Sequence, residues 1–135
     1  MRKGKIVGAI LCALTINCAI AQAYSGSFSF EIYDNVTGST KHSLEAVTTS
    51  CSATANTYHA TEGDTTTKDS YTVSLVETGL FGKTYTSVSM KADNVNRSHS
   101  YGKISKGTYN VSVVNKNSNA AAAGRYIKGS GTIKQ

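Results

Sequence analysis

The residue types that most often bind metals are few in this chain and lie far apart. Its imidazoles are His42, His59 and His99, and His59 with Glu62 is the pair that we consider as possible metal ligands. Zinc sites use closely spaced cysteine or histidine ligands, and this chain has no such spacing. We interpret the histidines as solvent-exposed loop residues and predict neither a metal site nor a cofactor.

Nucleophilic catalysis would require Cys51, because Cys12 and Cys18 stand in the N-terminal segment treated below. A Cys–His pair would bring one of the three histidines to this thiol. The alternation of side chains around Cys51 places the thiol inside a sheet sandwich, and no local signature marks it as a nucleophile. We therefore predict no catalytic residue and a buried, unpaired Cys51.

Acidic side chains cluster in one polar stretch, at Glu62, Asp64 and Asp69. Their spacing differs from that of the EF-hand calcium loop. We interpret them as solubilising residues of a loop. Nothing in the sequence selects two carboxylates as a pair for glycoside hydrolysis.

Aromatic and apolar residues of one hairpin and two strands provide the candidate binding residues. Leu80 and Phe81 stand between Gly79 and Gly82, which predicts a hairpin with an apolar tip. We expect this tip to fold back over the open end of the core, and the alternative is insertion into a membrane or partner. Tyrosine combines a flat apolar face with a polar end and suits sugar or protein contacts. Cross-strand packing also explains the strand tyrosines and is favoured, so a binding role for Leu80, Phe81, Tyr85 and Tyr109 is a hypothesis.

The N-terminal segment has the order of a secretory signal peptide. Arg2, Lys3 and Lys5 precede an apolar run at 6–16, and Ala21-Gln22-Ala23 follows. The run is shorter than a bilayer of about 30 Å requires. We predict cleavage after Ala23 and export of residues 24–135, with lipid attachment at Cys18 as the less favoured alternative.

The charge of the exported part is modest. Three of the 14 Lys and Arg residues lie in the signal peptide, which leaves 11 against 8 Asp and Glu, a net charge of +3. The basic residues are spread singly along the chain, without the runs that mark polyanion binding. No nucleic-acid partner is predicted, and weak contact with an anionic membrane is compatible with this charge.

Alternation of apolar and polar residues dominates residues 24–135 and predicts β-strands. Phe28, Phe30 and Ile32 share one side of the first strand, and Ile127 and Ile133 share one side of the last. We expect strands at 27–33, 43–55, 71–77, 84–92, 101–105, 107–114 and 125–133, a turn at 34–39, and polar loops at 56–70, 93–100 and 117–124. In the second strand a face of small side chains, from Val47 through Cys51 to Ala55, would let another layer approach closely.

The segment Gly107-Thr108-Tyr109-Asn110-Val111-Ser112-Val113 resembles the penultimate strand of secreted immunoglobulin-like or jelly-roll modules. The resemblance implies a sandwich. Together with the strand count it predicts an all-β fold: a single antiparallel β-sandwich, immunoglobulin-like or jelly-roll-like, of about seven or eight strands, with a small barrel as the second choice.

These observations favour a secreted, non-catalytic module that binds extracellular or cell-surface glycan or protein. The alternative is a small secreted toxin or antimicrobial protein that acts on membranes through the Leu80-Phe81 hairpin and a modest positive charge. An extracellular hydrolase ranks last.

Overall fold

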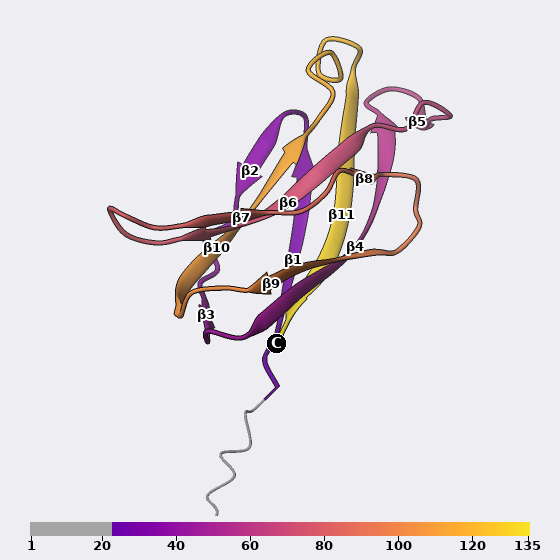
Figure 1. Cartoon of the computed structure of the whole chain (residues 1–135). Coiled ribbons are helices and arrows are strands. Elements are labelled where there is room, and N and C mark those ends of the chain that lie inside the picture. The colour runs from indigo at the N-terminus through magenta and orange to yellow at the C-terminus, as the bar shows by residue number, and fades with distance from the viewer. Residues whose placement is uncertain (1–22) are drawn as a thin grey trace, which may run out of the picture.

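The computed structural model describes residues 23–135, which form two antiparallel β-sheets packed as a sandwich (Figure 1). The strands are β1 (Ser25–Ile32), β2 (Asn35–Thr37), β3 (His42–Leu44), β4 (Thr48–His59), β5 (Gly63–Asp64), β6 (Ser70–Glu77), β7 (Thr84–Thr86), β8 (Met90–Lys91), β9 (Arg97–Lys103), β10 (Gly107–Asn115) and β11 (Arg125–Lys134). The prediction of an antiparallel β-sandwich is confirmed. The predicted signal peptide lies outside the described residues, apart from Ala23. Among residues 23–135, no helix has the length and apolar character needed to cross a membrane.

Each sheet is built on long central strands, and the shortest strands lie at the sheet edges. In the five-stranded sheet β11 pairs with β1 on one side and β4 on the other, and β4 also pairs with β5 and β9. In the six-stranded sheet β10 pairs with β6, β2 and β3, and β6 pairs further with β7 and β8. The outer face of the five-stranded sheet is therefore formed mainly by three long strands that lie side by side, β1, β11 and β4.

The structure has more strands than the seven or eight predicted, and the additional strands are short. β2 lies inside the turn predicted at 34–39, and the loop predicted at 56–70 holds the end of β4 and all of β5. β9 begins inside the loop predicted at 93–100. The strand predicted at 84–92 is divided into β7 and β8 near Ser87, whose Oγ accepts from the Val73 backbone N–H and donates to the Val88 carbonyl.

The face of small side chains predicted at 43–55 is present, but it begins at Thr49 instead of Val47. Val47 precedes β4, and 42% of its surface is exposed. Within β4 the buried residues alternate as Thr49, Cys51, Ala53 and Ala55. These small side chains leave room for larger ones from the neighbouring strands.

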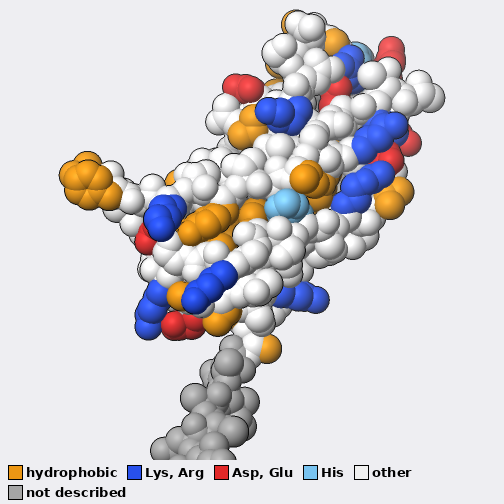
Figure 2. All heavy atoms as spheres, viewed as in Figure 1, with side chains coloured by type: hydrophobic (Ala, Val, Ile, Leu, Met, Phe, Trp, Pro, Cys, Tyr) orange, Lys and Arg blue, Asp and Glu red, His pale blue; other side chains and the backbone are white. Residues whose placement is uncertain are grey.

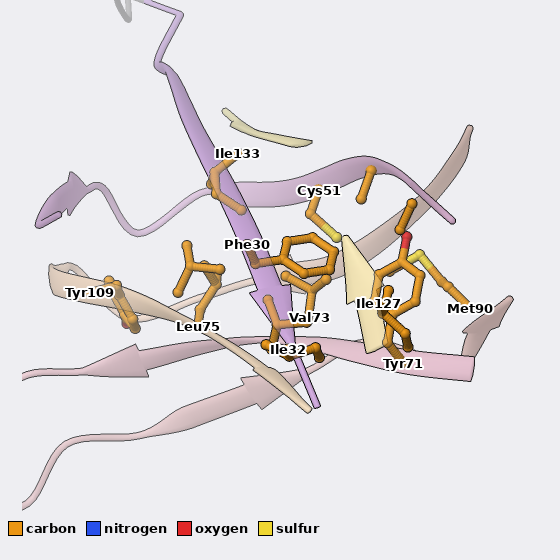
Figure 3. Close-up of a cluster of buried hydrophobic side chains, with 14 of the residues drawn as sticks. Phe30, Ile32, Cys51, Tyr71, Val73, Leu75, Met90, Tyr109, Ile127 and Ile133 are labelled. Carbon is orange, nitrogen blue, oxygen red and sulfur yellow. The ribbon is translucent and has the colours of Figure 1, made fainter. Parts of the chain in front are cut away.

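Two phenylalanines of β1 fill that room. Phe28 and Phe30 stand opposite Gly131 and Gly129 of β11, and each glycine stands opposite an alanine of β4. The phenyl rings therefore extend across the glycines toward β4, with their centroids 6.2 Å apart. Figure 3 shows the Phe30 ring among the buried side chains of both sheets. Among residues 23–135, the buried core runs from Phe30 to Ile133, with Tyr24 and Phe28 packed against it.

Cys51 is buried, as predicted, and burial raises the pKa of its thiol. Replacing Cys51 by alanine is expected to lower the free energy of unfolding by about 0.5–2 kcal/mol, because a small apolar side chain loses its packing. Urea unfolding of the two proteins measures the difference. The native thiol should also react slowly with a labelling reagent, and rapid labelling without denaturant would contradict its burial.

Candidate functional site

Leu80 and Phe81 lie at the tip of the hairpin between β6 and β7, with 91% and 92% of their surfaces exposed. This hairpin projects from the sandwich in Figure 1, and an apolar knob marks its end in Figure 2. The prediction that the two side chains fold back over the core is therefore wrong. The hairpin extends past the edge of the sheets, so its tip has no core beneath it.

The turn is held by its backbone and its two glycines. Gly79 has a φ of +120°, a conformation that side-chain-bearing residues rarely adopt. A Cβ on Gly82 would collide with the carbonyl oxygen of Glu77. The Glu77 N–H donates to the Lys83 carbonyl at 2.9 Å, and the Lys83 N–H donates to Glu77 Oε2 at 3.0 Å. The tip thus presents its two apolar side chains from a defined turn.

Tyr85 and Tyr109, the other two candidate binding residues, are neighbours with structural contacts. Their ring centroids are 6.2 Å apart. Tyr109 is fully buried and donates its hydroxyl to the Ser105 carbonyl at 2.6 Å, so it has no surface for a ligand. Tyr85 is partly exposed, and its hydroxyl oxygen accepts from the Ser105 N–H at 3.0 Å. The hydrogen bonds with Ser105 lower the pKa of Tyr85. A binding role for Tyr85 remains a prediction.

Two titratable residues interpreted as exposed are buried. His42 lies on β3 with its Nδ1 2.6 Å from the Tyr24 hydroxyl, and burial lowers the pKa of its imidazole. Asp69 is not a free loop carboxylate but is buried against the guanidinium of Arg125. Among residues 23–135, no group of three or more His, Cys, Asp and Glu side chains is arranged to hold a metal ion.

The strand register places His99 on β9 opposite Cys51 on β4. His42 and His59 do not pair with Cys51 in this register. The thiol beside it is buried, and its raised pKa keeps it protonated at neutral pH. The buried hydroxyl of Tyr71 lacks a partner among the described residues, and burial raises its pKa to about 12. The Cys51 environment therefore suits packing better than nucleophilic attack.

Three tyrosines form a row across the outer face of the five-stranded sheet. Tyr126 on β11 stands opposite Tyr58 on β4, and the two rings stack with their centroids 5.6 Å apart and their planes at 27°. Tyr33 follows β1, and its ring centroid is 5.5 Å from that of Tyr126. Tyr33 is 47% exposed, and the other two are partly exposed. We call Tyr33, Tyr126 and Tyr58 the tyrosine row.

Hydroxyl bonding separates this row from four of the other five tyrosines of the described chain. The fifth, Tyr71, also has a hydroxyl without a partner, but it is fully buried and cannot meet a ligand. The hydroxyls of Tyr24, Tyr85, Tyr101 and Tyr109 all have partners within the protein. The three hydroxyls of the tyrosine row make no hydrogen bond to any residue in the range 23–135. Partly exposed rings with unused hydroxyls are available to a ligand that offers both apolar and polar contacts.

Further along the same face lies a shallow groove of about 720 Å³ lined mainly by hydroxyl side chains. Its floor includes two cross-strand rows: Ser29, Ser130 and Thr54, followed by Ser27, Thr132 and Ser52. Residues 38–40 form one wall, and Asn96 forms part of the other. Asn96 binds the hydroxyls of Ser52 and Thr54 at 3.0 Å, whereas the hydroxyls on β1 and β11 have no partner within the described chain.

Charged groups of both signs lie between the tyrosine row and the groove. Lys128 and Glu31 are paired at 3.9 Å, and both side chains are exposed. Beside them Lys68 donates to Asp64 at 2.7 Å and to Asn56 at 2.8 Å, and the hydrogen bond from Lys68 lowers the pKa of Asp64. The face is therefore polar without a large excess of either charge.

The sequence carried a partial signal for this site. Tyr33 and Tyr126 each adjoin an inward-facing isoleucine, so period-2 alternation already placed them on the opposite, outer face. Tyr58 falls in the loop predicted at 56–70, because the polar stretch after Asn56 shows no alternation that marks the end of β4. The register that aligns the three residues depends on pairings between distant strands and was not accessible from the sequence.

The fold and this face define an all-β sandwich with an aromatic and hydroxyl-lined sheet surface. No protein-family model and no curated protein matches the chain. Among solved structures, a family two carbohydrate esterase from Cellvibrio japonicus is similar at 8% sequence identity and a TM-score of 0.35. The alignment covers 83% of this chain and 34% of the esterase chain, so the chain spans about a third of that structure. A similarity this low carries no argument about function.

Proposed function

We propose that the protein is a secreted, non-catalytic module that binds extracellular glycan through the outer face of its five-stranded sheet. The observation that carries this proposal is the tyrosine row, three adjacent, partly exposed rings whose hydroxyls are unused within the described chain. Sugars combine apolar C–H faces with many hydroxyls, and tyrosine complements both.

The groove extends the same chemistry along the strands. Successive outward-facing residues of a strand are about 6.6 Å apart, so the hydroxyl rows provide regularly spaced polar partners beyond the tyrosine row. Ser29 and Ser130 offer one donor and acceptor pair, and Ser27 and Thr132 offer the next. An elongated oligosaccharide lying along β11 would contact the rings first and these hydroxyls next. The mixed charges between them favour a neutral glycan over a polyanion.

Replacing Tyr126 by alanine is expected to weaken glycan binding at least about tenfold, because a central aromatic contact is worth about 1.4 kcal/mol or more. The Tyr126→Phe protein keeps the ring and should bind with intermediate affinity. Screening residues 24–135 on an array of glucan, xylan, mannan and chitin oligosaccharides identifies a ligand, and titration calorimetry measures the variants. Each lost cross-strand pair costs only about 0.2–1 kcal/mol, so the variants should remain folded.

The Leu80→Ser/Phe81→Ser protein is the matched control, because its substitutions lie far from the tyrosine row. Its affinity for the same oligosaccharide should equal that of the wild type. Absence of binding to every glycan on the array, or binding that survives Tyr126→Ala unchanged, would refute a glycan site at this face. A protein ligand lost on Tyr126→Ala would reassign the face to protein recognition.

A further inference from the structure

The β6–β7 hairpin carries an apolar tip, Leu80 and Phe81, that neither the fold nor the proposed glycan site uses. Leu80 and Phe81 are almost fully exposed, whereas the other exposed apolar residues retain at least partial cover from their surroundings. Figure 1 shows the hairpin projecting away from the end of the sandwich that holds β5, which pairs with β4 beside Tyr58. The apolar tip and the tyrosine row are thus separate surfaces.

The shape of the apolar tip restricts what it can contact. Two side chains on a convex tip offer far less area than the roughly 800 Å² per partner of a stable protein interface. A concave protein pocket would have to be complementary to the tip, whereas a lipid bilayer accepts an apolar projection of any shape. The turn also exposes these side chains without rearrangement, because its glycines and backbone hydrogen bonds already define it.

The charges near the tip are compatible with a phospholipid surface. Lys83 directly follows the turn and is exposed. Lys103 ends β9, and Lys106 lies in the turn between β9 and β10. Hydrogen bonds between Ser105 and Tyr85 hold this turn beside the hairpin. The nearby carboxylates are Glu77, bound to the Lys83 N–H, and Glu45, paired with Lys106 at 3.3 Å. No carboxylate lies within the turn residues 78–83 themselves.

We propose that Leu80 and Phe81 insert into the interfacial region of a phospholipid bilayer, so that the hairpin docks the protein on a membrane surface. Insertion removes two large apolar side chains from water, which supplies the main driving force. Lys83, Lys103 and Lys106 then lie near the headgroups and add attraction when these are anionic. Docking in this way leaves the tyrosine row directed away from the hairpin.

The chain contains no tryptophan, so Phe81→Trp introduces a single indole reporter at the tip. Residues 24–135 carrying this substitution are mixed with vesicles of phosphatidylcholine alone, or of phosphatidylcholine with phosphatidylglycerol. We expect the indole emission to shift to the blue with both, and at lower lipid concentration with the anionic vesicles. Leu80→Ser/Phe81→Ser should bind at least about tenfold more weakly in co-sedimentation and unfold at the wild-type temperature.

The matched control is Val88→Ser/Val95→Ser, which removes two other exposed apolar side chains from the same molecule. Its vesicle binding should equal that of the wild type. Dye release that disappears in the tip variant would also support insertion and would add membrane disruption to it. An unshifted emission with both vesicles, or equal loss of binding in both double variants, would overturn the proposal. So would a wild-type dimer that the tip variant abolishes, because a second copy would then cover the tip.

Discussion

Replacing Arg125 by methionine is expected to lower the free energy of unfolding by about 3–5 kcal/mol. Its guanidinium holds the carboxylate of Asp69, whose side chain is only 1% exposed, through Nε at 3.1 Å and Nη2 at 3.0 Å. Asn117 donates a further hydrogen bond to that carboxylate at 2.8 Å. Removing the cation would leave a buried charge without its counterion, which is far costlier than losing a surface pair.

Urea unfolding of residues 24–135 measures this effect. Lys128→Met on the same strand is the control, because it breaks the exposed pair with Glu31 and should cost less than about 1 kcal/mol. The double variant Arg125→Met/Asp69→Asn should recover part of the loss, since it leaves a neutral amide in place of a buried carboxylate. Equal effects of Arg125→Met and Lys128→Met would show that the buried pair has no special weight.

Replacing Gly131 by valine is expected to destabilise the sandwich by about 3 kcal/mol, at the upper end of the usual cost of overpacking. A Cβ at this position would meet Phe28 Cζ at 2.5 Å and would collide with the carbonyl oxygen of Ser52. Phe28 is partly exposed and its ring can shift, but the Ser52 carbonyl belongs to the adjacent strand β4 and cannot move away without disturbing the sheet.

The neighbouring Thr132→Val provides the control for this substitution. Thr132 points to the outer face, and its replacement keeps a β-branched side chain of similar size. We expect its free energy of unfolding to stay within about 0.5 kcal/mol of the wild type. A Gly131→Val protein as stable as Thr132→Val would show that β1 and β11 can separate enough to admit a side chain.

Much of the fold followed from alternation, where each strand buries one face. The sides assigned to Phe30, Ile32, Ile127 and Ile133 are the buried ones in the structure, and Cys51 lies where its neighbours indicated. The short strands β2, β5 and β8 contain only two or three residues, so no alternating pattern can develop within them. Their pairing is determined by the long strands beside them.

The candidate site was less accessible than the fold because it depends on register. In the tyrosine row, Tyr126 aligns with Tyr58, which lies 68 positions earlier in the chain, and with Tyr33, which directly follows β1. Asp69 and Arg125 likewise meet across 56 positions, which made a buried ion pair look like a loop acid. In the hairpin, the local sequence identified the apolar tip but not the direction in which the strands carry it.

Gly79 and Gly82 have a consequence for how this molecule can change. They define the turn through backbone conformation and close approach, and the two residues between them make no contact that the core requires. Positions 80 and 81 are therefore decoupled from folding, so new side chains there would alter what the protein meets while leaving the sandwich intact. A short recognition peptide or a spectroscopic label could be grafted onto the hairpin. Substitutions at the same two positions could also give the chain a new binding partner.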